Sequence, residues 1–198
     1  MRLRLLAAAL LLMSAPLAQA QLKDSQMVES YTQYVPSLAH MGLGMLGVRS
    51  EYDVAGRSLE LGYALVSQAL LVNCLLKPVV HEQRPDGSAF NSFPSGHTSL
   101  AFLGAELVRQ EYVWGWGGAA YGLAASVAVG RVVHRRHWWW DTVAGACTGI
   151  LCANIGHALV EPTYRLFGID SSKVPGMTLA PSIDPYSGTL CAQLAMTF

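Results

Sequence analysis

The sequence predicts an all-α fold, an antiparallel helical bundle that we expect to be embedded in a membrane. Hydrophobic residues make up 52% of the 198 residues and charged residues only 13%, about half the charged fraction of an ordinary soluble domain. The apolar segments are long and continuous rather than alternating, and this favours helices over strands. A mean hydropathy of +0.32 indicates a chain that buries most of its length in protein, in lipid or in both.

Residues 1–20 have the pattern of a signal peptide. Arg2 and Arg4 supply positive charge, residues 5–13 form a short apolar core, and Ala18-Gln19-Ala20 is a small-residue cleavage site. The alternative is a first membrane helix that is not cleaved, although the apolar run is shorter than a usual span of about 20 residues. Both interpretations send the chain along the secretory route.

Residues 21–33 form a polar N-terminal segment, and the helical domain follows at residues 34–170. Apolar segments predict its helices at residues 34–48, 59–76, 98–108, 116–133 and 142–160. Several of them approach the length of about 17 to 25 residues that crosses a bilayer. Hydropathy alone fits both a membrane bundle and a tightly packed soluble one. The short connections predict that neighbouring helices are antiparallel.

Residues 171–198 form a tail of different composition, in which Pro, Gly, Ser and Asp are frequent. Its last apolar residues alternate, as they do in a strand with one apolar face: Leu190, Ala192, Leu194, Met196 and Phe198. Segments 178–183 and 189–198 flank residues 184–188, whose Asp, Pro, Ser and Gly favour a turn. The tail is therefore predicted to contain a β-hairpin.

The charge balance excludes nucleic acid as the main partner. Lys and Arg number 13, as do Asp and Glu, so the net charge is zero and no basic surface is indicated that would neutralise phosphate backbones. Outside the termini, many of the charged and imidazole side chains fall in three short stretches, each at the end of a predicted helix. These are Lys77 with Arg84 and Pro85, then Pro94-Ser95-Gly96-His97, then Arg131 with His137 and Asp141.

The connection order places these three stretches at one end of an antiparallel bundle. Lys77, Arg84 and Arg131 supply three fixed cations there, and the helix predicted at residues 98–108 supplies free backbone N–H groups at its start. Such groups bind the non-bridging oxygens of a phosphoryl group. They also stabilise the charge that spreads over those oxygens during transfer.

Two histidines, His97 and His137, are available for the remaining chemistry. One would attack phosphorus while the other protonates the leaving oxygen. Asp141 follows His137 by four residues, a helical spacing that lets its carboxylate hold an imidazole in the required tautomer. The sequence contains no carboxylate cluster suited to Mg²⁺, so we expect chemistry that uses neither a metal ion nor a cofactor.

Together the three stretches resemble the signature of the type 2 phosphatidic acid phosphatase (PAP2) superfamily, which includes bacterial acid phosphatases and vanadium haloperoxidases. The family pattern is K-x6-RP, PSGH and SR-x5-H-x3-D, and residues 59–160 match it in order and spacing. Gly130 departs from the pattern, because it stands where the family usually has Ser. This replacement removes a hydroxyl donor but leaves every charged and nucleophilic group in place.

The resemblance implies a role for each motif residue. His137 would be the nucleophile that forms a phosphohistidine, His97 the acid and later the base that activates water, and Asp141 the partner that orients His137. Phosphate would be bound by Lys77, Arg84, Ser95, Gly96 and Arg131.

The resemblance also implies a phosphatase that acts on a phosphomonoester or pyrophosphate of a membrane lipid. The substrates it implies are the phosphates of lipid A, phosphatidylglycerol phosphate, phosphatidic acid and undecaprenyl pyrophosphate, and the short signal-bearing chain resembles lipid A phosphatases of Gram-negative bacteria. We expect the site to face the periplasm from the bacterial inner membrane, since two predicted crossings separate Lys77 from an exported Gln21. Three alternatives stay open: a soluble periplasmic acid phosphatase, a vanadium haloperoxidase and a non-catalytic envelope protein that keeps an anion site.

Residues outside the motifs allow more than one interpretation. Trp138, Trp139 and Trp140 form either an aromatic belt at a membrane interface or ordinary packing around the site. His40 and His157 lie within apolar segments and match no motif, so we expect both to pack in the core.

Overall fold

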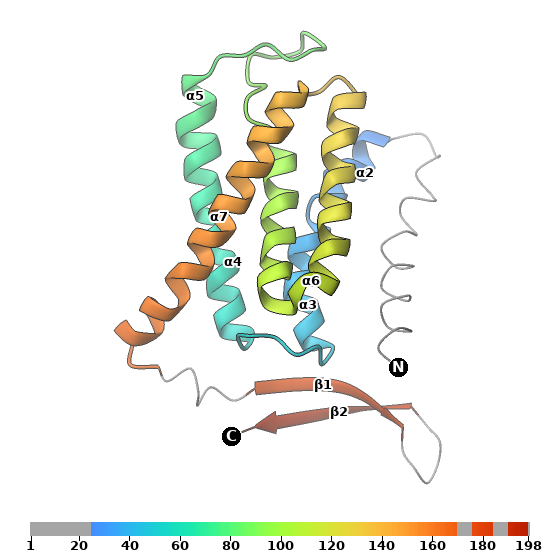
Figure 1. Ribbon diagram of the computed structural model, residues 1–198, viewed down its shortest axis with the longest axis vertical. Helices are drawn as coiled ribbons and strands as arrows, with labels where there is room; N and C mark the ends of the chain where they lie inside the picture. Colours follow the sequence, from blue (N-terminus) through green and yellow to red (C-terminus); the bar gives the residue numbers. More distant parts are fainter. Residues whose placement is uncertain (1–24, 170–175, 184–189, 198) are drawn as a thin grey trace.

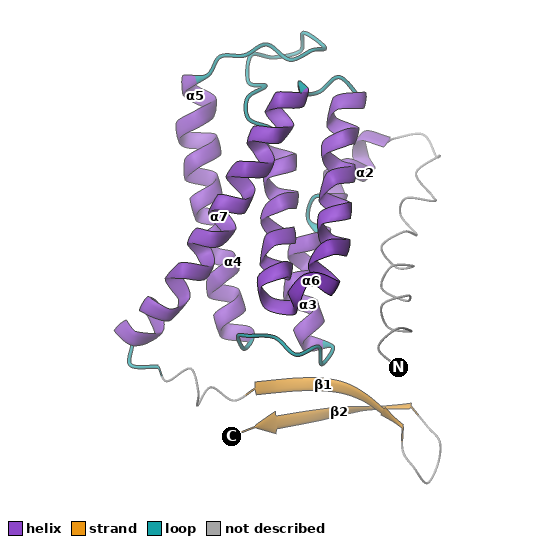
Figure 2. Ribbon diagram, in the orientation of Figure 1, coloured by secondary structure: helices purple, strands orange, loops and turns teal. Residues whose placement is uncertain are grey.

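Helices and loops make up the bundle, and the described strands are confined to the C-terminal tail (Figures 1 and 2). The computed structural model describes residues 25–169, 176–183 and 190–197. Its helices are Ser25–Thr32 (α2), Val35–Met45 (α3), Val54–Gln68 (α4), Lys77–Val79 (α5), Gly96–Val133 (α6) and Trp139–Leu166 (α7), and a π-helical stretch, Ala69–Leu76 (η1), joins α4 to α5. The predicted all-α bundle is confirmed, while the predicted signal peptide at residues 1–20 lies outside the described residues.

The segments α4, η1 and α5 form one continuous helical rod, Val54–Val79, which includes the apolar segment predicted at residues 59–76. The rod begins after Asp53, whose side chain accepts a hydrogen bond of 2.9 Å from the backbone N–H of Gly56. This bond satisfies one of the free donors in the first turn. The rod ends at Val80, which has an extended backbone. Lys77 consequently lies in the last turn, beside the α5–α6 loop.

The helix α6 is a hairpin rather than a straight rod. The rings of Phe102 and Tyr121 are 5.7 Å apart, although a straight helix would separate these positions by about 28 Å. Figure 1 shows the two arms, the first green and the second yellow, joined at the end of the bundle nearer to the tail. Close approach at the reversal requires a small residue, because a Cβ atom on Gly117 would lie 2.7 Å from Arg109 Cβ. The segments predicted at 98–108 and 116–133 are therefore two arms of one element.

The helix α7 packs along both α6 and α4, and glycines allow the backbones to approach closely. A Cβ atom on Gly145 would lie 2.5 Å from the carbonyl O of Ser95, and one on Gly156 would lie 2.5 Å from the carbonyl O of Glu60. Such contacts through small residues are typical of membrane bundles. They fix α7 against the start of α6, where the second predicted motif lies.

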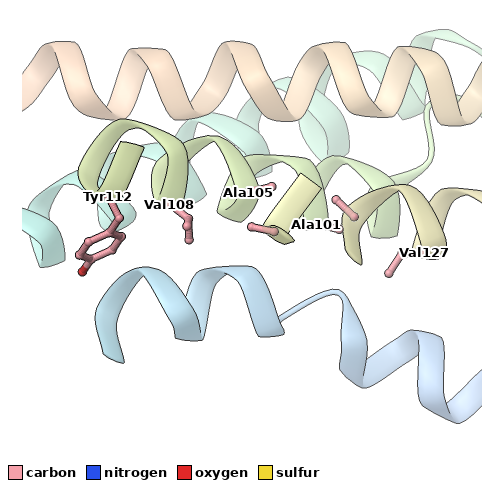
Figure 3. Packing of buried hydrophobic residues seen from close by; sticks show 7 residues of the cluster. Ala101, Ala105, Val108, Tyr112 and Val127 are labelled. Atoms are coloured by element: carbon pink, nitrogen blue, oxygen red, sulfur yellow. The ribbon is translucent and has the colours of Figure 1, made fainter. Parts of the chain in front are cut away.

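Small side chains fill the space between the arms of α6 and the neighbouring helix α3 (Figure 3). The first arm contributes Ala101, Ala105, Val108 and Tyr112, and the second arm contributes Ala120, Ala124 and Val127. A second buried group joins α4, α6 and α7: Ala64, Leu103, Leu107, Cys152 and Ala153. Because alanine is small, the helix axes can lie close together throughout this core.

A buried polar network connects α3, α4 and α7. The Glu60 carboxylate lies 3.3 Å from His40 Nε2 and 2.8 Å from His157 Nδ1. Arg57 donates a hydrogen bond of 2.7 Å to the hydroxyl of Tyr112, which itself donates to the carbonyl O of His40. The predicted core position of His40 is confirmed, since this residue is fully buried. Both histidines are held by a buried carboxylate rather than by apolar packing alone.

Two described helical segments are long and apolar enough to cross a membrane, Val54–Val79 and Trp139–Leu166. The length and apolar composition of these two segments are consistent with membrane association.

The tail forms the predicted β-hairpin. The strand Gly176–Ile183 (β1) pairs antiparallel with Leu190–Thr197 (β2), with Gly176 opposite Thr197 and Ile183 opposite Leu190. The turn predicted at residues 184–188 lies outside the described residues. In Figure 1 the two strands cross the end of the bundle that lies opposite to the α5–α6 loop.

Candidate active site

The helix ends that carry the predicted motifs lie at one end of the bundle (Figure 1). This arrangement follows from the antiparallel order of the α4 to α5 rod, the two arms of α6, and α7. Lys77 begins α5, Arg84 lies in the α5–α6 loop, Ser95 caps α6, Gly96 and His97 begin it, Arg131 lies in its last turn, and His137 and Asp141 lie at the start of α7.

Backbone hydrogen bonds fasten the α5–α6 loop to the start of α7. The N–H of Ser95 donates to the carbonyl O of Asp141 at 3.0 Å, and this bond joins the second motif to the third. The N–H of Ser92 donates to the carbonyl O of Glu82, also at 3.0 Å. The two limbs of the loop are therefore tied to each other and to α7, the helix that follows the nucleophile candidate.

Gly96 and Ser95 shape the start of α6. Lys77 Nζ lies 3.6 Å from the position that a Cβ atom on Gly96 would occupy, so the first motif also reaches this point. The Ser95 hydroxyl accepts a hydrogen bond from the N–H of Thr98 at 3.4 Å and lies 3.0 Å from Thr98 Oγ1. The hydroxyl of Ser95 thus caps α6, and its backbone N–H binds the carbonyl O of Asp141. The free N–H groups expected to face an anion are those that follow Ser95.

The ring of His137 is held by a backbone carbonyl. Its Nδ1 lies 2.8 Å from the carbonyl O of Ser92 and 3.6 Å from Asp141 Oδ2. A carbonyl oxygen can only accept, so Nδ1 carries the proton and Nε2 carries the lone pair. Burial, followed by the charges of Arg131 and Arg84, lowers the pKa of His137 to about 4. The imidazole is therefore neutral near pH 7, as a nitrogen nucleophile must be.

Ser92 contacts both Asp141 and His137. The Asp141 carboxylate is fully buried, and Oδ2 accepts hydrogen bonds from the Ser92 hydroxyl and from the N–H of Trp138, the latter at 2.9 Å. The closeness to His137 that the spacing of four residues predicts is present, but the 3.6 Å between His137 Nδ1 and Asp141 Oδ2 is too long for a hydrogen bond. The reason is that α7 begins only at Trp139, so His137 lies outside the helix and turns towards the α5–α6 loop.

His97 lies in the first turn of α6 and is half-buried. Burial, followed by the nearby positive charges of Arg131, His137, Lys77 and Arg84, lowers its pKa to about 4. Cations of the first and third motifs lower the pKa of this histidine of the second motif because the three motifs lie close together. In the absence of an anion, His97 is neutral above about pH 5.

Backbone contacts position Arg131, and a side-chain hydrogen bond within the α5–α6 loop positions Arg84. Arg131 is buried, and its carbonyl O accepts from the N–H of Arg136 at 3.0 Å and from the N–H of His137 at 3.2 Å. Arg84 Nε donates to Asn91 Oδ1 at 3.1 Å. The unusual Gly130 is the residue before Arg131 in the helix, so its replacement of Ser leaves this backbone connection intact.

Two of the three consecutive tryptophans bind the α5–α6 loop. Trp138 Nε1 donates to the carbonyl O of Gln83 at 3.0 Å, and Trp140 Nε1 donates to Glu82 Oε1 at 2.8 Å. Their rings are stacked with centroids 5.1 Å apart, while the ring of Trp139 meets Trp140 edge-on at 5.6 Å. Packing around the site therefore accounts for Trp138 and Trp140, whereas the indole N–H of Trp139 has no hydrogen-bond partner among the described residues.

Sequence reasoning missed Ser92 and Glu82. Ser92 is fully buried and contacts both His137 and Asp141, which follow it by 45 and 49 residues. Glu82 accepts from Trp140, and burial, with the nearby Asp141, raises the pKa of its carboxyl group. Only the position of Ser92 immediately before Phe93 and the second motif could have drawn attention to it. A serine in a loop has no pattern of its own.

A helical bundle that gathers three cations, two neutral imidazoles and a buried aspartate at one end has the construction of a histidine-based phosphate site. The class defined by this fold and these three motifs is that of the PAP2-type proteins. Residues 57–165 match the PAP2 superfamily, and the chain belongs to this family.

Known proteins of two kinds are similar to the chain. Lipid A 1-phosphatase of Porphyromonas gingivalis is 34% identical over 149 residues, an alignment that covers 70% of this chain and 32% of that protein. The chain thus spans about a third of the length of this curated relative. The crystal structure of Aquifex aeolicus LpxE matches with a TM-score of 0.53 and 20% identity, over 76% of this chain and 93% of that one. This second likeness shows that the two share a fold.

Proposed function

We propose that the chain is a metal-independent phosphatase that hydrolyses a phosphomonoester or pyrophosphate of a membrane lipid through a phosphohistidine intermediate. The observation that carries the proposal is the 2.8 Å hydrogen bond from His137 Nδ1 to the carbonyl O of Ser92. It leaves the unprotonated Nε2 as the one ring atom able to attack phosphorus.

In the first step, His137 Nε2 attacks phosphorus and forms a P–N bond while the ester P–O bond breaks. His97, protonated when the substrate is bound, gives its proton to the leaving oxygen. Lys77, Arg84 and Arg131 stabilise the charge on the three non-bridging oxygens. The products of this step are the free lipid alcohol, neutral His97 and phosphorylated His137.

In the second step, neutral His97 takes a proton from a water molecule as that water attacks phosphorus. The P–N bond breaks, its electron pair returns to His137 Nε2, and inorganic phosphate is released. His97 has regained its proton and His137 its lone pair, so the cycle is closed. Asp141 and Ser92 hold the ring of His137 in the same tautomer throughout.

Exposed apolar side chains support a lipid environment for the chain. The two span-length helices are mostly exposed along their apolar windows, where the core helix of a soluble protein would be mostly buried. The exposed large residues on these helices include Leu65, Val66, Leu70, Leu75, Val143, Leu151, Ile155 and Leu159. A soluble periplasmic acid phosphatase would expose these side chains to water, and we therefore favour the membrane-embedded form.

Lipid A is the substrate to test first, because one relative is a lipid A 1-phosphatase. We further propose that the site faces the periplasm from the bacterial inner membrane. Export directed by the signal peptide would place the first described helix, α2, in the periplasm. The domain organisation that accompanies this proposal is a signal peptide at 1–20, a polar segment at 21–33, the phosphatase domain at 34–170 and the tail at 171–198.

The test measures phosphate release in detergent from lipid A, phosphatidic acid, phosphatidylglycerol phosphate, undecaprenyl pyrophosphate and the water-soluble ester p-nitrophenyl phosphate. The His137→Ala variant should lose activity by about 10⁴-fold, as expected when a nucleophile is removed. His81→Ala is the matched control, because His81 is an exposed histidine of the same end of the molecule. The proposal is wrong if the wild type releases phosphate from none of these compounds, or if His137→Ala retains full activity.

The intermediate and the metal independence are tested separately. Acid-labile, alkali-stable label should appear on the protein after rapid mixing with substrate carrying radioactive phosphate, and should be absent from His137→Ala. Turnover should be unchanged by EDTA. Label on another residue type, or loss of turnover in EDTA that Mg²⁺ restores, would contradict the mechanism while leaving the phosphatase activity itself established.

A further inference from the structure

Exposed apolar side chains lie close in sequence to four residues of the candidate active site. Val79 follows Lys77 by two residues, Val133 follows Arg131 by two, and Trp139 follows His137 by two. Phe90 precedes the buried Ser92 by two in the α5–α6 loop. These four side chains are 70%, 68%, 63% and 63% exposed respectively, and we call them the apolar rim.

The rim belongs to four different segments that end at the site. Val79 ends α5, Val133 ends α6, Trp139 begins α7, and Phe90 lies in the loop between α5 and α6. Figure 1 shows these helix ends and this loop together at one end of the bundle. Exposed apolar side chains at four neighbouring segment ends favour contact with an apolar partner.

The indole N–H of Trp139, the tryptophan of the rim, has no hydrogen bond in the described part of the chain. Trp140, on which Trp139 packs edge-on at 5.6 Å, is fixed by its hydrogen bond to Glu82. Trp138 and Trp140 direct their N–H groups to the loop. Trp139 is therefore a rigid, exposed ring that costs little conformational entropy to bury.

Helix length and charge indicate which partner covers the rim. The rods Val54–Val79 and Trp139–Leu166 contain 26 and 28 residues, about 39 and 42 Å, and exceed the hydrocarbon thickness of about 30 Å. Their ends at Val79 and Trp139 thus reach the headgroup layer. The cations Lys77 and Arg131 lie at the same helix ends as Val79 and Val133, and they match the anionic phosphates of that layer.

We propose that the apolar rim lies in the interfacial layer of a lipid bilayer and holds the hydrocarbon part of the substrate beside the site while its phosphate reaches the cations. This inference rests on the proposed lipid phosphatase function and adds the residues that select an amphiphilic substrate over a soluble one. Trp139 is expected to contribute most, because tryptophan is the largest side chain of the rim and favours the membrane interface.

The test compares two substrates in the full-length chain, in mixed micelles of a neutral detergent. The first is the lipid phosphate that the wild type cleaves fastest, and the second is p-nitrophenyl phosphate. In Trp139→Ala the ratio of kcat/KM for the lipid to kcat/KM for the soluble ester should fall about tenfold, through KM for the lipid, as expected for loss of a half-buried aromatic contact. Trp139→Phe should restore most of the ratio.

Trp114→Ala is the matched control, because Trp114 is 68% exposed and lies in the reversal of α6, at the other end of the bundle. Its ratio should equal that of the wild type. The inference is overturned if Trp139→Ala leaves the ratio unchanged or lowers it no more than Trp114→Ala does. It is also overturned if Trp139→Ala dissociates an oligomer in light scattering, since the rim would then be covered by a second copy. A wild type that cleaves no lipid phosphate would instead refute the proposed function.

Discussion

Ser92 connects the candidate nucleophile to its aspartate. Its carbonyl O accepts the hydrogen bond from His137 Nδ1 at 2.8 Å, and its hydroxyl donates to Asp141 Oδ2. Asp141 itself is 3.6 Å from His137. The orientation of the imidazole is therefore fixed by a loop residue, and the buried carboxylate fixes that loop residue in turn. Ser92 is a positioning residue, because it touches neither substrate nor phosphorus in the proposed mechanism.

Replacing Ser92 by alanine should lower kcat by about 10- to 100-fold and change KM little. The substitution keeps the carbonyl that binds His137 but removes the hydroxyl bonded to Asp141, and a hydrogen bond to a charged group contributes about 1.5–3 kcal/mol. Ser88→Ala is the matched control, since the Ser88 hydroxyl binds the exposed Asp86 in the same loop. Steady-state kinetics on p-nitrophenyl phosphate measure both variants. If Ser92 had only a structural role, Ser92→Ala would reduce the amount of folded protein, and the protein that still folds would have a normal kcat. Ser92→Thr keeps the hydroxyl and should recover much of the rate.

Binding of a dianion should drive proton uptake by the free protein between pH 5 and 6.5. The pKa of His97 is lowered to about 4 by burial and by the surrounding cations. A bound dianion offsets that positive charge and raises the pKa towards its ordinary value of about 6.5. Sulfate is a suitable probe because it does not titrate in this range. Calorimetry at pH 6 in buffers of different ionisation enthalpy should report uptake of up to about one proton.

The proton uptake should be lost in His97→Ala and retained in His81→Ala. If His97→Ala takes up no proton, then His97 is the group that becomes protonated when the anion binds. A general acid must be protonated at that point. An observed heat that is independent of the buffer would show that the anion leaves His97 neutral. The proposed division of labour between the two histidines would then be wrong.

Stability should fall as the pH is lowered from about 6.5 to about 4. The pKa values of His97 and His137 are lowered to about 4 in the folded chain, while an unfolded histidine has a pKa of about 6.5. The unfolded state consequently binds more protons in this window, and the free energy of unfolding rises with pH there. The stabilisation is fully present above pH 6.5. Thermal unfolding in detergent, followed by circular dichroism, should show that lowering the pH from about 6.5 to about 4 decreases the Tm of His137→Gln less than the Tm of the wild type. His81→Gln should behave like the wild type.

The bundle and the three motifs could be predicted from the sequence because both depend on local patterns. Long apolar segments indicate helices, and motifs placed at helix ends converge once the helices are antiparallel. The sequence predicts two helices separated by a gap at residues 109–115, where α6 reverses its direction. The chain remains helical through that gap, which apolar periodicity cannot reveal.

The contacts that depend on tertiary structure could not be predicted. Ser92 acts across 45 residues on His137, and a loop serine gives no signal of this role. Ser95 matches the motif, yet its hydroxyl caps α6, because the N-cap position and the phosphate site coincide. Glu60 lies between His40 and His157, and only the packing of three helices brings those side chains together.

Gly145 should be intolerant of even the smallest side chain. A Cβ atom there would lie 2.5 Å from the carbonyl O of Ser95 and 3.2 Å from Thr98 Cβ, so Gly145→Ala must push α7 away from the start of α6. The displacement would stretch the bond from the N–H of Ser95 to Asp141, which joins the second and third motifs. We expect a lower Tm in detergent and a loss of kcat of at least about tenfold, since a misplacement of 1 Å can cost about 100-fold.

Gly122→Ala is the matched control for this substitution. Gly122 is a helical glycine of α6 with open space where a Cβ atom would stand, and alanine is favoured over glycine in a helix by about 1 kcal/mol. Its Tm should equal or slightly exceed that of the wild type, with unchanged kcat. If Gly145→Ala is as stable and as active as Gly122→Ala, then the close approach of α7 to Ser95 does not hold the site together.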